Sequence, residues 1–315
     1  MKYIKGCLKF AMLPVVLAAL AGCGSSSGTD EDATGTLSLA VSDGPVHDAL
    51  KVCVAFDTVE FKIAGEGEEP STVVNLDPAE TINLLDFQGM NAAPLLIDQE
   101  LTAGDYEWIR LGVDADLGNN GGMGDTDGVM CDGAGSYIKM SDGGVYNLYI
   151  PSGAETGLKL VSGFTVPVNG SADFTVEFDL MKSITAPPGL SPNVILRPAL
   201  RLVNDVDAGA LTGSVASDLA TAEACEASVY VFDDGVTPNA IDDGETADPN
   251  DPVATAIVNE TMAANGQMEY TYTVGYLLAG DYVAAFTCDG TTFEPVDGLG
   301  ATITANGTTT LDFGF

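Results

Sequence analysis

Two acidic segments of this sequence carry side chains suited to binding a hard metal ion. Ca²⁺ takes six to eight oxygen ligands, and aspartate carboxylates are common donors. The candidate ligands fall in the segments 114–127 and 233–251: Asp114, Asp116, Asp125, Asp127, Asp233, Asp234, Asp242, Asp243, Asp248 and Asp251. Neither segment has the Asp-x-Asp-x-Asp-Gly order of an EF-hand loop. A calcium site and a solvated acidic loop therefore both stay open for each segment.

The residue types give little support to a catalytic site. The chain contains one histidine, His47, in a predicted loop at 44–48. We expect His47 to have no catalytic role, and a histidine-rich metal centre is excluded. Carboxylate pairs for glycoside hydrolysis are defined by their spacing in the folded protein, and among 46 acidic residues such pairs arise by chance. The sequence therefore predicts a protein that is not an enzyme.

An aromatic strand offers a second kind of binding chemistry. Tyr106, Trp108 and Arg110 alternate with Ile109 and Leu111, so the pattern places the two sets on opposite strand faces. An exposed aromatic face could stack on sugar rings. We expect instead that a neighbouring loop buries it.

The chain is strongly acidic, with 46 Asp and Glu against 11 Lys and Arg. A field of this sign repels phosphate backbones, so nucleic acid is excluded as a partner. The acidity suits either solubility in salt water or binding of divalent cations. We expect several of the scarce basic residues to pair with acids such as Asp179: Arg110, Lys159, Lys182, Arg197 and Arg201.

The N-terminus has the order of an export signal. Lys2 and Lys5 precede the apolar run 10–19, which is shorter than the roughly 20 residues of a bilayer span. The following Leu20-Ala21-Gly22-Cys23 resembles the lipobox of bacterial lipoproteins, in which the cysteine is acylated. The resemblance implies a signal peptide over 1–22, lipid (palmitate) at Cys23 and a flexible tether over 23–34. With Gly24 next, it also implies the outer membrane, on its periplasmic or exposed side; an ordinary signal peptide is the alternative.

Four cysteines remain once Cys7 in the leader and Cys23 are set aside. An even number in an exported chain indicates disulfides, with three possible connectivities. Pairing within the two predicted domains gives Cys53–Cys131 and Cys225–Cys288.

The elements that must position these residues are β-strands. Phe174, Val176, Phe178 and Leu180 alternate with polar residues, which predicts a strand with one wet face. Apolar parity switches within 52–63, which predicts a bulge near Asp57. Asn-Gly pairs predict hairpin turns at 169–170, 265–266 and 306–307.

An internal echo predicts two related domains. Ala-Gly-Asp-Tyr occurs at 103–106 and again at 279–282, each time before a strand pattern. We therefore predict an all-β chain with two antiparallel β-sandwich domains in tandem, over 35–204 and 209–315.

The first predicted domain resembles a family of bacterial lipoproteins, domain of unknown function 4382. The likeness is carried by the segments 35–45, 101–106, 109–111, 151–160, 178–183 and 196–203. It implies a β-sandwich in the cell envelope and supplies no catalytic residues. The second predicted domain more loosely resembles carboxypeptidase-regulatory and immunoglobulin-like sandwiches, through 213–215, 229–232 and the turn at Gly280.

Together these patterns predict an outer-membrane-anchored lipoprotein with a non-catalytic binding or structural role, for which calcium is the candidate cofactor. Its expected partners are the membrane, through the lipid, and an envelope protein or glycan. The alternative is a carbohydrate-binding or carbohydrate-processing envelope protein with an unrecognised carboxylate site.

Overall fold

The computed structural model places most of the chain after the predicted tether. It describes residues 33–67, 69–115, 122, 124–125, 130–151, 157–185, 193–241 and 248–314. The predicted lipid site Cys23 and the candidate ligands Asp116, Asp127, Asp242 and Asp243 lie outside the described residues. In the described part, no helix has both the length and the apolar character needed to cross a membrane.

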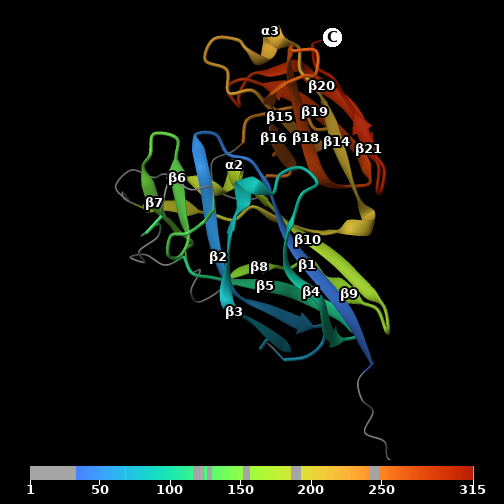
Figure 1. Ribbon diagram of the computed structural model, residues 1–315. Helices are drawn as coiled ribbons and strands as arrows, with labels where there is room; N and C mark the ends of the chain where they lie inside the picture. The colour runs from blue at the N-terminus through green and yellow to red at the C-terminus, as the bar shows by residue number, and fades with distance from the viewer. Residues whose placement is uncertain are drawn as a thin grey trace, which may run out of the picture. The chain divides into compact units, whose positions relative to one another are not determined.

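The first sandwich is formed by two sheets that share one apolar core. In the smaller sheet β1, β10 and β4 run side by side (Figure 1), in the order β13 (Leu200–Asn204), β10 (Ser171–Asp179), β1 (Thr34–Gly44), β4 (Ala93–Thr102). The larger sheet has the order β11 (Ile184–Thr185), β12 (Asn193–Leu196), β7 (Val145–Tyr149), β6 (Tyr137–Met140), β2 (Ala49–Ile63), β5 (Gly104–Val113), β8 (Leu158–Leu160). Strand β3 (Thr72–Asn83) pairs with β2, and β9 (Phe164–Val166) pairs with β5.

The second sandwich has two four-stranded sheets. One has the order β17 (Asn259–Met262), β18 (Met268–Leu278), β14 (Ala208–Ser214), β21 (Thr308–Thr310). The other has the order β16 (Ala254–Ile257), β15 (Ser228–Asp233), β19 (Gly280–Thr287), β20 (Phe293–Ile303). Short helical turns join strands in both sandwiches: η1 (Leu84–Asp86), α2 (Leu180–Ser183), η2 (Asp205–Asp207) and α3 (Ser217–Ala220).

The apolar alternation of the sequence is what builds these cores. Leu37, Leu39 and Val41 of β1 are all buried. In β2 the register shifts between Phe56 and Thr58, so apolar residues of both parities face inward. The predicted all-β sandwich fold and the predicted bulge near Asp57 are confirmed.

Two of the three predicted hairpins are wrong. Asn265-Gly266 does join the antiparallel pair β17–β18. Asn169 and Asn306, by contrast, have positive φ angles but lie where the chain leaves one sheet and enters the other. The strands that follow them pair in parallel, β10 with β1 and β21 with β14. The local turn signal is real, but the pairing is set by which sheet buries the next apolar face.

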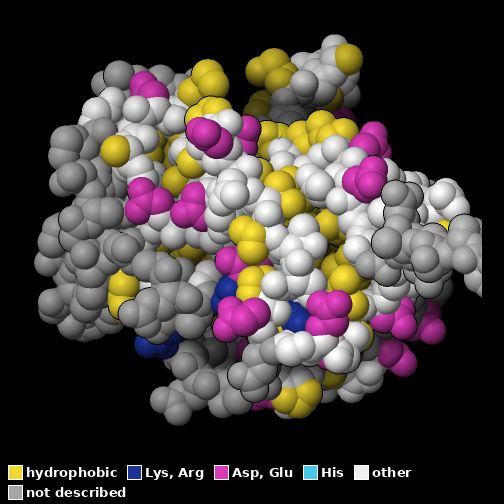
Figure 2. Space-filling view, turned by 90° about the horizontal axis from the view of Figure 1, so that it is seen from below, with side chains coloured by type: hydrophobic (Ala, Val, Ile, Leu, Met, Phe, Trp, Pro, Cys, Tyr) yellow, Lys and Arg dark blue, Asp and Glu magenta, His cyan; other side chains and the backbone are white. Residues whose placement is uncertain are grey.

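Both predicted disulfides are present. Cys53 is bonded to Cys131 in the first sandwich and Cys225 to Cys288 in the second. Acidic side chains spread over the face seen in Figure 2, with few basic ones among them.

Truncation of Phe178 tests the first core. Its ring meets Phe56 of the facing sheet edge-to-face, with centroids 6.3 Å apart, and both side chains are fully buried. Phe178→Ala should lower the free energy of unfolding by about 3–5 kcal/mol in urea denaturation, because it leaves a cavity. The exposed Val168→Ala is the control; equal losses for the two variants would contradict the assigned core.

Candidate functional site

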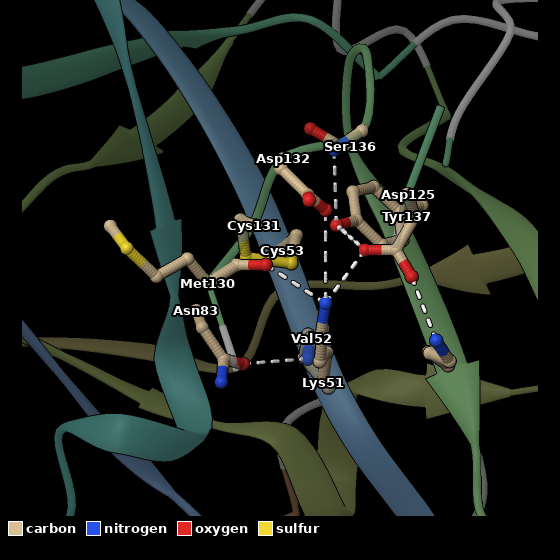
Figure 3. Close-up of a disulfide and its surroundings, with 12 residues drawn as sticks. Lys51, Val52, Cys53, Asn83, Asp125, Met130, Cys131, Asp132, Ser136 and Tyr137 are labelled. Atoms are coloured by element: carbon tan, nitrogen blue, oxygen red, sulfur yellow. Dashed lines mark hydrogen bonds and ion pairs between the residues drawn. A yellow bond between two sulfur atoms is a disulfide. The ribbon is translucent and has the colours of Figure 1, made fainter. Parts of the chain in front are cut away.

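Asp125, in the acidic segment after β5, is held by a buried lysine (Figure 3). Lys51 is only 4% exposed. Its Nζ donates to Asp125 Oδ1 at 2.7 Å and to the Met130 carbonyl at 2.8 Å, and lies 4.0 Å from Asp132 Oδ1. On the same carboxylate, Tyr137 donates to Oδ1 at 2.7 Å and Lys139 to Oδ2 at 2.9 Å. We call Lys51, Asp125, Asp132, Tyr137 and Lys139 the Lys51 cluster.

Strand geometry explains why these residues meet. Lys51 and Cys53 are two positions apart on β2, so their side chains lie on one face. Lys51 pairs with Lys139, and Cys53 with Tyr137, across to β6. The disulfide to Cys131 brings the flanking oxygens of residues 130 and 132 to Lys51. Two lysines side by side would repel each other, and the Asp125 carboxylate offsets that repulsion because it contacts both.

The cluster is built for charge balance and is unsuited to acid–base chemistry. Burial alone would raise the pKa of Asp125, but hydrogen bonds from Lys51, Tyr137 and Lys139 outweigh it and hold that pKa well below its usual range. Burial and the bond to Asp125 raise the pKa of Tyr137. The Asp125 carboxylate is therefore ionised at any ordinary pH, and the Lys51 ammonium supplies a positive charge that balances it.

The remaining candidate calcium ligands are dispersed. Asp114, Asp233 and Asp234 are exposed. Asp248 Oδ1 accepts hydrogen bonds from the backbone and the side chain of Asn250. Within the described ranges, no three His, Cys, Asp or Glu side chains are grouped closely enough to hold a metal ion. Asp251 therefore belongs to no such group. Calcium binding stays a prediction.

The aromatic strand does not form a sugar-stacking surface. The register of β5 against β2 shifts between Trp108 and Tyr106, which turns Tyr106 into the core, where it stacks on Phe164 at 4.9 Å. The predicted shared face of Tyr106 and Trp108 is therefore wrong. Trp108 is 7% exposed, so its expected burial is confirmed. The side chains over its ring are Arg110 of β5 and Lys159 of β8, which are strand residues and do not belong to the predicted neighbouring loop.

His47 connects the sandwiches. Its Nε2 lies 2.8 Å from the buried Ser228 Oγ, whose hydroxyl proton goes to the Glu226 carbonyl. The network thus assigns the Nε2 proton to the imidazole, which donates to Ser228 and is not placed to take a proton from it. Burial lowers the pKa of His47, which keeps the ring neutral.

A second charged group lies where the two sandwiches meet within the compact unit Ala33–Phe315. Asp43, Glu177 and Asp179, which we call the junction acids, are all buried. Asp179 Oδ1 accepts from Thr255 Oγ1 at 3.2 Å, across the junction. The face of β10 predicted to be wet is therefore covered from Thr175 onward, and that prediction is wrong there.

Two basic residues partly compensate the junction acids. Lys182 Nζ is 3.8 Å from Asp179 Oδ2, and Arg201 donates to the Tyr276 carbonyl at 3.2 Å. Burial raises the pKa of Glu177 from 4.5 to about 8, against the opposing charge of Arg201. Burial likewise raises the pKa values of Asp43 and Asp179.

The prediction that several basic residues pair with acidic ones is confirmed for two of the five. Lys182 pairs with Asp179 and Arg110 with Glu60. Lys159 lies over the Trp108 ring, and Arg197 is exposed.

The residues that form strands β1 to β12 match the model of a known protein family. The family model for a domain of unknown function, DUF4382, matches residues 34–198. The chain belongs to the DUF4382 family. The second sandwich of this DUF4382 protein lies outside the match, and no curated protein is significantly similar to the sequence.

Several solved pilin structures are similar at low identity. The minor pilin GBS52 of Streptococcus agalactiae is 12% identical, with 88% of this chain and 94% of that chain covered and a TM-score of 0.19. The major pilin of Streptococcus pyogenes is 13% identical, with 89% and 98% covered and a TM-score of 0.16. The shaft pilin spaA of Lactobacillus rhamnosus GG is 10% identical, with 90% and 98% covered and a TM-score of 0.18. Scores this low support no conclusion about function.

Sequence reasoning missed the Lys51 cluster and the junction acids as groups. The available signal was a charged residue at an inward position of an apolar strand, as at Lys51 beside Val52 and Cys53. Such a position requires a buried partner. The partners of Lys51 lie 74 to 81 residues away in the sequence, so their identity required the fold.

Replacing Lys51 tests the cluster. Lys51→Met removes a charged hydrogen bond to a buried carboxylate while Lys139 and Tyr137 still bind it. We expect the free energy of unfolding to fall by about 2–3 kcal/mol in urea denaturation. Lys159→Met, at an exposed position, should cost much less. A Lys51→Met variant as stable as the wild type would contradict the cluster.

Glu177 should make stability depend on pH. Because its native pKa is raised, the folded protein keeps a proton that the unfolded chain releases above pH 4.5. The stability that this proton contributes is therefore full below pH 4.5 and is lost as pH rises to about 8, by at most about 1.4 kcal/mol per pH unit. Glu177→Gln should reduce the slope of the urea-denaturation profile across this window. The exposed Glu269→Gln should leave the slope unchanged; equal slopes in all three proteins would refute the assignment.

Proposed function

We propose that this DUF4382 protein is a lipid-anchored, non-catalytic binding or structural module of the cell envelope, attached to the outer membrane. The N-terminal sequence supports the anchor, because a short apolar run ends in Leu-Ala-Gly-Cys and is followed by a polar tether. The two disulfides support an oxidising compartment.

One observation carries the non-catalytic part of the proposal. In the described part of the chain, three side chains with catalytic potential are bonded into the scaffold. His47 holds a buried serine, Asp125 binds two lysines and a tyrosine, and Asp179 binds across the junction. A general base must be free to reach a substrate proton, and these groups already have internal partners.

Calcium belongs to the proposal only at the second acidic segment. In the first, the Lys51 ammonium already supplies positive charge to Asp125 and the Met130 carbonyl. Asp233 and Asp234 at the end of β15 are exposed and open to a cation.

Substitution of Cys23 tests the anchor. Cys23→Ala should move the protein from the membrane fraction to the soluble fraction, and the wild-type N-terminus should carry lipid mass in intact mass spectrometry. Cys7→Ala, within the predicted leader, is the matched control and should remain in the membrane fraction. An unmodified Cys23 in membrane-extracted protein would overturn the proposed anchoring.

A further inference from the structure

A small cleft separates the segment 87–91 of the first sandwich from the sheet edge of the second. Its volume is about 230 Å³, and its walls include Pro45, Gln88, Met90, Asn91, Asn259 and Thr271. We call it the junction cleft. Ligand sites often form where two folded bodies meet, and drug-sized ligands occupy about 300–1,000 Å³. The junction cleft is therefore of a size for one small ring.

The segment that forms one wall is held rigidly from both sides. Ser42 Oγ lies 3.1 Å from the Phe87 carbonyl and 2.9 Å from the Asn91 carbonyl. Tyr276 of the second sandwich donates to the Met90 carbonyl at 3.3 Å. A Cβ atom at Gly275 would lie 1.9 Å from the Gly89 carbonyl oxygen. The two backbones therefore come so close together that only glycine fits at position 275. The cleft is pre-formed, which lowers the entropy lost on binding.

The chemistry of the walls is uncharged. No Asp, Glu, Lys, Arg or His lines the cleft, and the one ionisable residue there, Tyr272, donates its hydroxyl to the Leu311 carbonyl. Gln88, Asn91 and Asn259 bring amides, and Thr271 and Thr273 bring hydroxyls. Asn91 Nδ2 donates to the Gln88 carbonyl at 3.1 Å and Asn259 Nδ2 to the Ile257 carbonyl at 3.4 Å. Met90, 48% exposed, adds an apolar surface at the rim.

These walls select a ligand class. The net charge of −35 opposes anions, and the cleft offers a cation no carboxylate. Amides and hydroxyls that can both donate and accept, beside an apolar patch, complement a ring that carries hydroxyls and C–H faces. We infer that the junction cleft binds one residue of a neutral saccharide. This inference rests on the proposed binding role and assigns it a ligand.

Binding can be measured on the full chain purified in detergent. Saturation-transfer NMR with neutral malto-, manno-, cello- and chito-oligosaccharides should detect a ligand, and glucuronic acid and glucosamine serve as charged probes. Asn259→Trp, on an exposed strand, should abolish the signal by filling the cleft. Thr271→Val should weaken binding about fivefold to tenfold through one lost hydrogen bond. Thr310→Val, exposed on β21, is the matched control and should bind as the wild type does.

The outcomes separate this inference from the proposed function. Neutral-saccharide binding that Asn259→Trp removes, in a variant with an unchanged melting temperature, supports it. Absence of binding by every neutral probe, binding that survives Asn259→Trp, or stronger binding of a charged probe overturns it. A negative result with normal membrane anchoring would leave the envelope module standing without this ligand. Loss of anchoring alone would overturn the proposed function.

Discussion

Compensation of buried charge is the constraint on which this structure depends. An isolated ionised side chain in an apolar interior is strongly destabilising unless it is paired or neutralised. The chain has 46 acidic and only 11 basic residues, yet Lys51 and Lys139 both contact the single carboxylate of Asp125. At the junction there are fewer basic side chains than acidic ones, because only Lys182 and Arg201 face the three buried junction acids in the described part of the chain. There a proton on Glu177 supplies the missing compensation.

This constraint also shapes what the protein can do. Asp125 and Asp179 carry carboxylates that could act as bases or metal ligands in another setting, and here they serve as internal counter-charges. The loop 87–91 shows the complementary case, since it is fixed by neutral hydrogen bonds and glycine contacts and carries no charged side chain. In the proposed binding role, recognition falls to pre-formed uncharged surfaces such as the junction cleft, because the acidic field opposes anions.

The sequence predicted local features well and long-range burial poorly. The switch in apolar parity near Asp57 is a local signal, and it correctly predicted the bulge in β2. The even cysteine count is a matter of arithmetic, and it correctly predicted the two disulfides. The alternating pattern of β10 predicted that its polar face is exposed to solvent. Such a pattern shows which face of a strand packs on its own core, but it does not show that a second sandwich covers the other face. Tyr106 changed faces through one irregularity in register, which no periodic pattern contains. The Lys51 cluster needed partners distant in sequence, so only its lysine could have been suspected.

Carbon-detected NMR titration of the Asp and Glu carboxyls tests the central claim most directly, because it reads each buried charge separately. The account predicts that Asp125 stays ionised through the range in which exposed carboxyls titrate, while Glu177 titrates near 8. Titration of both at the ordinary values of about 4 would show that neither carboxyl is held as described, and would contradict the account.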